Sequence, residues 1–296
     1  MTISPRVWLL LFVVSFWALG CNGMQAAGPA RGPLDFRDGT VLSADGVPIH
    51  FREGGRGATA LVFVHGWLGN ASWWATTMER FAPSYRVVAL DLAGHGSSGK
   101  KREQWTVERF ADDVVAVVRA LDLERVVLLG HSMSGTITVQ AAGVLGPRVV
   151  LLVPVDTLND AEWDLPPEVW DQFFGGLRAD FPNAVEGFFR NMLFAPSSPA
   201  DVVARIVAEA RAADPALAIP MLERAREFSL PDALRRLRVP VHALNSDTNP
   251  TNLATNRKYV EHFDVELLPG SGHWPMLEDP AAFGDALEKV VGTLRP

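Results

Sequence analysis

Residues 130–135 are Gly130-His131-Ser132-Met133-Ser134-Gly135, a serine with small residues two positions before and after it. The apolar run 125–129 favours a strand, and residues 136–142 can form a helix. A short strand, a tight turn around a serine and a helix form the sequence pattern of a nucleophile elbow. Small neighbours suit such a strained turn, because larger side chains there would collide. Without chemistry, the same stretch is a glycine-rich turn between a strand and a helix.

Three further motifs follow apolar segments in the order that this pattern needs. Residues 60–64 lead into His65-Gly66-Trp67, and residues 87–90 lead into a D-x-x-G-x-G-x-S turn at 91–98. Residues 265–280 combine a last strand, a loop with His273 and the start of a last helix. With four motifs in this order, the chain resembles the α/β-hydrolase family over most of its length.

The resemblance implies a role for each motif. Ser132 would be the nucleophile and His273 the base that takes its proton, because a serine hydroxyl is a poor nucleophile at neutral pH. The backbone N–H groups of Trp67 and Met133 would form the oxyanion hole. Asp91 and His95 are interpreted as hydrogen-bonded scaffold groups of the glycine-rich turn.

The acid of the triad is the point where the sequence departs from the family. Most members place an aspartate directly before a proline, in the turn after the seventh strand. Here residues 239–244 form that strand, and the residue before Pro250 is Asn249. An asparagine can orient an imidazole but carries no charge, and losing that charge costs about four orders of magnitude in a related triad.

Two carboxylates are candidates for the missing acid. Asp247 lies in the same turn, two residues before Asn249. Asp156 follows the sixth strand, at a place where some family members, including certain dehalogenases and lipases, carry the acid. We prefer Asp156 over Asp247, because the end of the sixth strand should also lie beside the histidine loop. Either residue could instead be a hydrogen-bonding turn residue.

The remaining pattern predicts an α/β fold. Residues 41–53, with Asp45-Gly46 in the middle, are typical of a β-hairpin. Six more strands are expected near 60–64, 86–90, 125–129, 148–155, 239–244 and 263–268, and helices near 71–81, 106–121, 133–143, 252–262 and 280–293. This alternation predicts a mostly parallel eight-stranded sheet with helices on both faces. The predicted core comprises residues 35–157 and 233–296.

Residues 158–232 interrupt this core after the sixth strand and have helical periodicity. Candidate helices are 167–181, 183–194, 199–213 and 216–228, separated by prolines. The first two are rich in aromatic residues, of which we expect most to form the core of the insertion and some to line a substrate cavity. By resemblance, this segment would be a helical cap over the nucleophile.

Composition limits the classes of partner. The chain has 296 residues, 48% of them hydrophobic, and a formal charge of −7. It contains no basic stretch that could neutralise phosphates, so we expect no nucleic-acid partner. The seven histidines lack H-x-x-x-H or H-E-x-x-H spacing, so we expect neither metal nor cofactor. The expected partner is a small-molecule ester or acyl compound, apolar in part.

The first residues are typical of an export signal. Residues 1–20 hold one charge, Arg6, followed by an apolar run that is rather short for a membrane span. Ala18-Leu19-Gly20-Cys21 resembles a bacterial lipobox, although alanine stands where leucine is expected. We therefore predict a signal peptide over 1–20, a tether over 21–34 and membrane attachment only through a lipid on Cys21. Cleavage near 24–28, giving a secreted or periplasmic soluble protein, is the alternative.

The leading functional hypothesis is a serine hydrolase that cleaves a carboxylic ester or related acyl bond through an acyl-enzyme. Ser132, rather than an aspartate, at the elbow argues against a dehalogenase or an epoxide hydrolase. Lactone, amide or carbon–carbon bond cleavage and perhydrolysis on the same triad stay open, because specificity lies in the cap and loops. The absence of an acid at Asn249 keeps a catalytically silent binding protein as a second hypothesis.

Overall fold

A computed structural model describes residues 35–294 of the chain, so the predicted signal peptide and tether lie outside the described residues. Eight strands form one sheet in the order β1-β2-β4-β3-β5-β6-β7-β8. Strands β1 and β2 pair antiparallel, and β2 joins β4 antiparallel, whereas the pairs from β4 through β8 are parallel. The predicted mostly parallel eight-stranded sheet is therefore confirmed. The strands are β1 (Arg37–Leu42), β2 (Pro48–Gly55), β3 (Ala60–Val64), β4 (Arg86–Leu90), β5 (Val126–His131), β6 (Val149–Val155), β7 (Val241–Ser246) and β8 (Phe263–Leu268).

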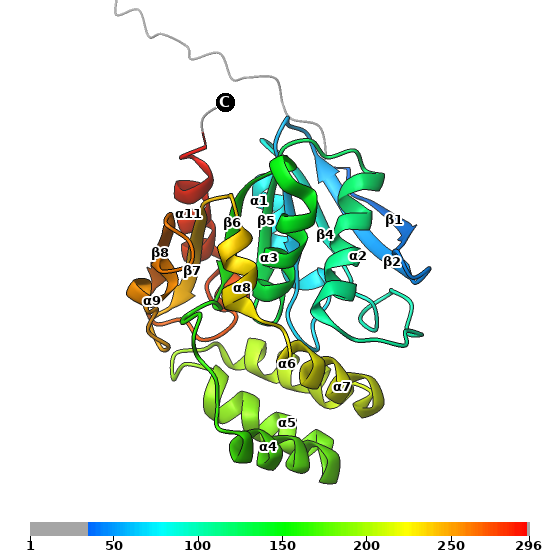
Figure 1. Cartoon of the computed structure of the whole chain (residues 1–296), viewed down its shortest axis with the longest axis vertical. Helices are drawn as coiled ribbons and strands as arrows, with labels where there is room; N and C mark the ends of the chain where they lie inside the picture. The colour runs from blue at the N-terminus through cyan, green and yellow to red at the C-terminus, as the bar shows by residue number, and fades with distance from the viewer. Residues whose placement is uncertain (1–34, 295–296) are drawn as a thin grey trace, which may run out of the picture. The chain divides into compact units, whose positions relative to one another are not determined.

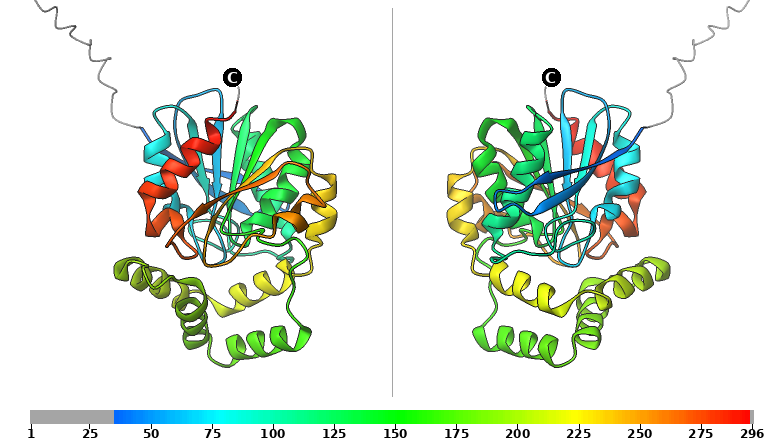
Figure 2. Two further views of the ribbon diagram at one scale, coloured as in Figure 1. Left: turned by 90° about the vertical axis from the view of Figure 1, so that its left-hand side faces the viewer. Right: turned by 90° about the vertical axis from the view of Figure 1, so that its right-hand side faces the viewer.

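Helices cover both faces of this sheet (Figure 2). One face carries α1 (Ala75–Phe81) and α11 (Pro280–Val291), and the other carries α2 (Val107–Ala120), α3 (Ser134–Leu145) and α8 (Leu230–Arg236). Four shorter helices complete the core: η1 (Ala71–Trp74), η2 (Gly146–Arg148), α9 (Leu253–Arg257) and α10 (Pro275–Glu278). The helix predicted over 252–262 is shorter than expected, because the chain has to turn before β8 begins.

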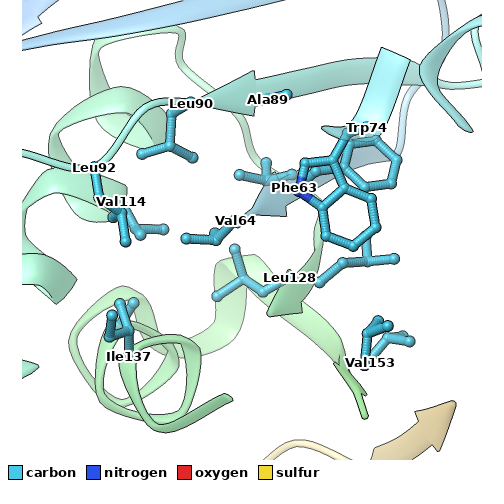
Figure 3. Packing of buried hydrophobic residues seen from close by; sticks show 14 of the residues in the cluster. Phe63, Val64, Trp74, Ala89, Leu90, Leu92, Val114, Leu128, Ile137 and Val153 are labelled. Carbon is cyan, nitrogen blue, oxygen red and sulfur yellow. The ribbon is translucent and has the colours of Figure 1, made fainter. Parts of the chain in front are cut away.

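The central strands are buried on both faces, which explains their uninterrupted apolar sequence. Every residue of β3 and β5 is buried. Phe63 and Trp74 pack on one side of the sheet, with ring centroids 5.2 Å apart, while Val64 points toward Val114 and Ile137 on the other (Figure 3). Because β3 and β5 are locked in this core, the loops at their carboxyl ends are held in fixed positions.

A helical insertion separates β6 from β7 and lies at one end of the sheet (Figure 1). It contains α4 (Pro167–Ala179), α5 (Phe181–Phe188), the π-helical turn η3 (Phe189–Leu193), α6 (Ala200–Arg211) and α7 (Pro215–Ala225). The helix predicted over 183–194 is thus divided between α5 and η3, and α8 extends past residue 232 to pack on α3. Within residues 35–294, none of the helices has the length and apolar character that crossing a membrane requires.

Candidate active site

Ser132 occupies a strained turn between β5 and α3. Its φ is +53°, a left-handed conformation that non-glycine residues rarely adopt and that is typical of functional sites. The turn is fixed on both sides, because the N–H of Ser132 donates to the carbonyl of Val155 over 3.1 Å and the N–H of Gly135 donates to the carbonyl of Ser132 over 2.9 Å. The strand, the turn and the helix lie in the order that the sequence predicted.

The neighbours of this serine must be small for a steric reason. A Cβ atom at Gly130 would lie 2.3 Å from the backbone oxygen of Ser134, and one at Gly135 would lie 2.4 Å from Cγ2 of Thr157. Ser134 is fully buried, and its hydroxyl donates to the backbone oxygen of His65. The elbow is therefore packed against the loop that follows β3.

That loop carries the backbone N–H of Trp67 toward the elbow, which itself carries the backbone N–H of Met133. A Cβ at Gly66 would lie 2.9 Å from Cβ of Ser132, which shows how closely the two turns approach. Neither the backbone N–H of Trp67 nor that of Met133 donates a hydrogen bond to any residue within 35–294. Two unused donors beside a serine can stabilise a developing oxyanion.

His273 lies in the loop between β8 and α10, and the structure brings Asp156 to it. Oδ2 of Asp156 is 2.6 Å from Nδ1 of His273. Oδ1 of the same carboxylate accepts two hydrogen bonds of 2.8 Å from the N–H and the hydroxyl of Ser246, at the end of β7. With Nδ1–H donated to Asp156, the imidazole presents the lone pair of Nε2, the tautomer that a general base needs.

The surroundings of Asp156 favour its charged form. Burial acts to raise the pKa of this carboxyl, but the hydrogen bond and positive charge of His273, together with the donors of Ser246, outweigh burial and hold the pKa below its ordinary value. Asp156 is also in the left-handed region, with φ +45°. Two of the three proposed triad positions thus have strained backbone, which is typical of residues held for function.

The other candidate acid points elsewhere. Oδ1 of Asp247 accepts a hydrogen bond of 3.1 Å from the N–H of Gly270, at the start of the histidine loop. Asn249 lies in the same turn, and its carbonyl accepts from Nδ2 of Asn159 over 2.7 Å. Of the two carboxylates that the sequence left open, Asp156 is therefore the one in contact with the imidazole.

His131 links the elbow to the histidine loop. Its Nε2–H donates to the carbonyl of His273 over 2.7 Å, and the two rings lie with centroids 4.7 Å apart. Burial, followed by the nearby positive form of His273, lowers the pKa of His131 well below its ordinary value, so this ring stays neutral. Within residues 35–294, Ser132 and His273 share no direct hydrogen bond; such bonds are often long in a free enzyme.

Asp91 and His95 are hydrogen-bonded within the glycine-rich turn, as the sequence indicated. Asp91 accepts from the N–H groups of Ala71 at 2.7 Å and Ser97 at 2.8 Å. His95 approaches the carbonyl of Ala93 at 3.1 Å, and its burial lowers its pKa to about 3. His65 is held similarly, with a pKa of about 4. These buried groups shape the loops around the elbow.

Aromatic side chains from the insertion reach the same end of the sheet. The indole N–H of Trp67 donates to the carbonyl of Ala218 over 2.8 Å, and the rings of Phe181 and Phe189 contact that of Trp67. Phe189 also contacts Trp274, the residue after His273, with centroids 5.2 Å apart. The insertion therefore packs on both the loop after β3 and the histidine loop. No group of ligands that could hold a metal ion is found among the described residues.

Sequence reasoning missed three polar residues at this site: His131, Ser246 and Glu278. His131 and Ser246 bind partners that are remote in sequence, whereas Glu278 accepts the N–H groups of Gly272 and Trp274 in the histidine loop, and none of these contacts follows a spacing rule. Ser246 could have been noticed as a hydroxyl at the carboxyl end of a predicted strand, beside the strand that carries Asp156.

Comparisons with known proteins agree with this fold. The model of the Alpha/beta hydrolase family matches residues 61–286. A pimeloyl-(acyl-carrier protein) methyl ester esterase from Pectobacterium carotovorum is 28% identical over 249 residues, which are 79% of this chain and 95% of that protein. A non-heme chloroperoxidase from Streptomyces lividans is 36% identical over 152 residues, 48% of this chain and 55% of that protein.

The matches of higher identity are partial. The chain spans only 28% to 55% of the length of three curated relatives, one of which is this chloroperoxidase. Among solved structures, an esterase from Exiguobacterium antarcticum has the same fold with a TM-score of 0.76 and 21% identity, covering 86% of this chain and 99% of that one. Since the family model covers most of the described residues, the chain belongs to the α/β-hydrolase family.

Proposed function

We propose that the protein is a serine hydrolase of carboxylic esters, with Ser132, His273 and Asp156 as its triad. The observation that carries the proposal is the 2.6 Å contact between Asp156 and His273, beside a serine on a strained turn. The similarity to an esterase of a methyl ester supports the same bond type. In the proposed triad, Asp156 at the end of β6 takes the place of the uncharged Asn249, which weakens the main argument for a silent binding protein.

The proposed reaction has two halves. Oγ of Ser132 attacks the ester carbonyl while Nε2 of His273 takes its proton, and the N–H groups of Trp67 and Met133 hold the oxyanion. His273 then protonates the leaving alkoxide, which departs as the alcohol and leaves an acyl-serine. Water, deprotonated by His273, attacks this acyl-enzyme, and the carboxylic acid leaves as His273 returns the proton to Oγ of Ser132. Asp156 stabilises the imidazolium in both halves.

The aromatic side chains of the insertion favour a substrate that has an apolar group. Phe181 and Phe189 of the insertion pack against Trp67, whose N–H belongs to the proposed oxyanion hole. Apolar rings at this place favour burial of an acyl or alcohol chain. The insertion over 158–232 would then act as a cap that sets specificity.

A panel of nitrophenyl esters of increasing acyl length, assayed on the mature protein, tests the proposal. We expect turnover by the wild type and none above background with Ser132→Ala, which removes only a hydroxyl. Fluorophosphonate should label the wild type at Ser132 alone. Equal turnover by wild type and Ser132→Ala would contradict the assignment, and failure to label would favour the binding-protein hypothesis.

We also propose that the protein is exported and attached to a membrane through Cys21. The support is the sequence of residues 1–21, which combines one basic residue, an apolar run and a small residue before the cysteine. A tether of residues 21–34, rich in glycine and proline, would separate the lipid from the folded core.

A further inference from the structure

One carboxylate accepts hydrogen bonds from the backbone on both sides of His273. Glu278, at the end of α10, accepts the N–H of Gly272 over 2.8 Å and the N–H of Trp274 over 2.9 Å. The side chain is buried, with the residue 9% exposed. Hydrogen bonds to an ionised acceptor are roughly twice as strong as neutral ones. Glu278 therefore holds the peptide groups immediately before and after the proposed base.

The insertion contacts the same carboxylate. Ser198, just before α6, donates its hydroxyl to Oε2 of Glu278 and accepts the N–H of Ala195 over 2.9 Å. The N–H of His273 itself donates to the carbonyl of Leu193, the last residue of η3, over 2.7 Å. Residues 193–198 of the insertion are thus hydrogen-bonded directly to the histidine loop.

The histidine loop and the insertion are in close backbone contact at Gly272. A Cβ at Gly272 would lie 2.7 Å from the nitrogen of Ala195 and 2.8 Å from the oxygen of Leu193. Since backbone atoms cause both contacts, the histidine loop and the insertion can approach this closely only with glycine at this position. A displacement of residues 193–198 would therefore displace the loop as well.

These contacts complete the support of the base. Asp156 binds Nδ1 of the ring and His131 binds the carbonyl of His273, so Glu278 and Leu193 supply the remaining hydrogen bonds to the adjacent backbone. Misplacing a reacting group by about 1 Å can cost about 100-fold in rate. Side chains that orient this backbone are therefore expected to affect turnover without touching substrate.

We infer that Glu278 is a positioning residue for His273, and that Ser198 connects the inserted helices to the base through it. The effect on rate rests on the proposed ester hydrolysis. The insertion then influences the turnover step itself, in addition to any part that it has in binding substrate. Neither Glu278 nor Ser198 takes part in proton transfer.

Ser198→Ala is the first test, because it removes one of three hydrogen bonds to Glu278 and little volume. We expect kcat for a nitrophenyl ester to fall about three- to tenfold, with KM changed less than about twofold. Ser198→Thr retains a hydroxyl and should restore most of kcat. Ser229→Ala is the matched control, because its hydroxyl binds Asp232 on the surface, away from the histidine loop.

Glu278→Gln is the second test and preserves side-chain size. The amide nitrogen would face a backbone N–H, so one hydrogen bond is replaced by a repulsive contact between two donors. We expect kcat to fall about 10- to 100-fold. Thermal unfolding measured on the same samples separates this loss from failure to fold.

A measurement without substrate keeps this inference separate from the proposed function. The proton between Nδ1 of His273 and Asp156 should give a downfield NMR signal, which we expect to shift or broaden in Ser198→Ala but not in Ser229→Ala. If the wild type hydrolyses no ester while this signal responds, the proposed function fails and the positioning role stands. An unchanged signal in both Ser198→Ala and Glu278→Gln, or a rise in KM with kcat unchanged, would overturn the inference.

Discussion

Oδ2 of Asp156 lies 2.6 Å from Nδ1 of His273, although the two residues are 117 positions apart in the chain. The contact exists because β6 and β7 are neighbours in the sheet, so the end of β6 faces the loop after β8 across the end of β7. A carboxylate at this place can orient the imidazole and stabilise its protonated form.

Asp156→Asn should therefore lower kcat by about four orders of magnitude, because an amide cannot stabilise the imidazolium. Asp247→Asn should change kcat only a few-fold, since Asp247 contacts the backbone of Gly270 and not the ring. Ester hydrolysis by the two purified variants, measured beside the wild type, compares them directly. The reverse order of effects would return the acid to the turn after β7.

The sequence narrowed the acid to two residues and favoured Asp156 from the expected place of the sixth strand beside the histidine loop, because no local pattern distinguishes the two. Asp156 and Asp247 both follow predicted strands, and both turns were expected near His273. The choice depends on where two loops meet in space, and on Ser246, whose N–H and hydroxyl fix Oδ1 of Asp156. Such contacts across the sheet leave no periodic signal in the chain.

Two buried histidines should make the fold less stable in acid. Burial lowers the pKa of His65 to about 4 and that of His95 to about 3, whereas both would titrate near 6.5 when unfolded. Between pH 6.5 and 4 the unfolded chain binds more protons, so the free energy of unfolding falls as the pH falls. Each histidine contributes at most about 1.4 kcal/mol per pH unit.

Urea unfolding at several pH values between 7.5 and 4.5 measures this dependence. His95→Asn retains a donor for the carbonyl of Ala93 and should reduce the slope of stability against pH. His262→Asn, at an exposed histidine, is the matched control and should keep the wild-type slope. An identical slope in wild type and His95→Asn would show that His95 does not cause the acid sensitivity.

Gly130→Ala should destabilise the nucleophile turn, because the new Cβ would lie 2.3 Å from the oxygen of Ser134 and 2.6 Å from Oγ1 of Thr138. Overpacking of this kind costs about 1–3 kcal/mol, or several degrees in Tm, and should also lower kcat by moving Ser132. Gly143→Ala, in the following helix α3, meets no atom within 4 Å and should stabilise the protein by about 0.5–1 kcal/mol. Calorimetry of both variants tests the contrast; equal Tm values would contradict it.

The elements around Ser132 could be predicted because their signals are local. Strand β5 begins with the unbroken apolar run 126–129, and small residues at Gly130 and Ser134 mark the turn. The insertion was harder, because its helices are held by contacts such as that of Trp67 with Ala218, which joins segments 151 residues apart. The π-helical turn η3 interrupts a segment that periodicity alone assigns to one helix.

Cys21→Ser should release the protein from the membrane, if Cys21 carries the lipid that the sequence predicts. The wild type, expressed in a bacterial host, should fractionate with membranes, and the variant should appear in the soluble fraction. Removal of residues 1–20 takes away Arg6, so the mature chain has a formal charge of −8 against −7 for the whole sequence. Soluble protein of the same mass from both versions would exclude lipidation.

Ser246→Ala should shift the acid limb of the pH–rate profile. The hydroxyl of Ser246 donates to Oδ1 of Asp156 over 2.8 Å and helps to hold the pKa of this carboxyl below its ordinary value. Without that donor, the pKa of Asp156 rises, so the carboxylate loses its charge at a higher pH as the solution is acidified. The backbone N–H of Ser246 remains, which keeps the change modest.

We expect kcat to fall about three- to tenfold at neutral pH in Ser246→Ala, with a steeper loss of kcat on acidification than in the wild type. The contribution of Asp156 to stability has the same sign: it is present above the unfolded pKa and disappears as the pH falls through the folded pKa. Ser246→Thr retains the hydroxyl and should keep the wild-type profile. Equal profiles for Ser246→Ala and wild type would show that the backbone N–H alone supports Asp156, and a loss of kcat that is uniform at all pH values would assign Ser246 to packing.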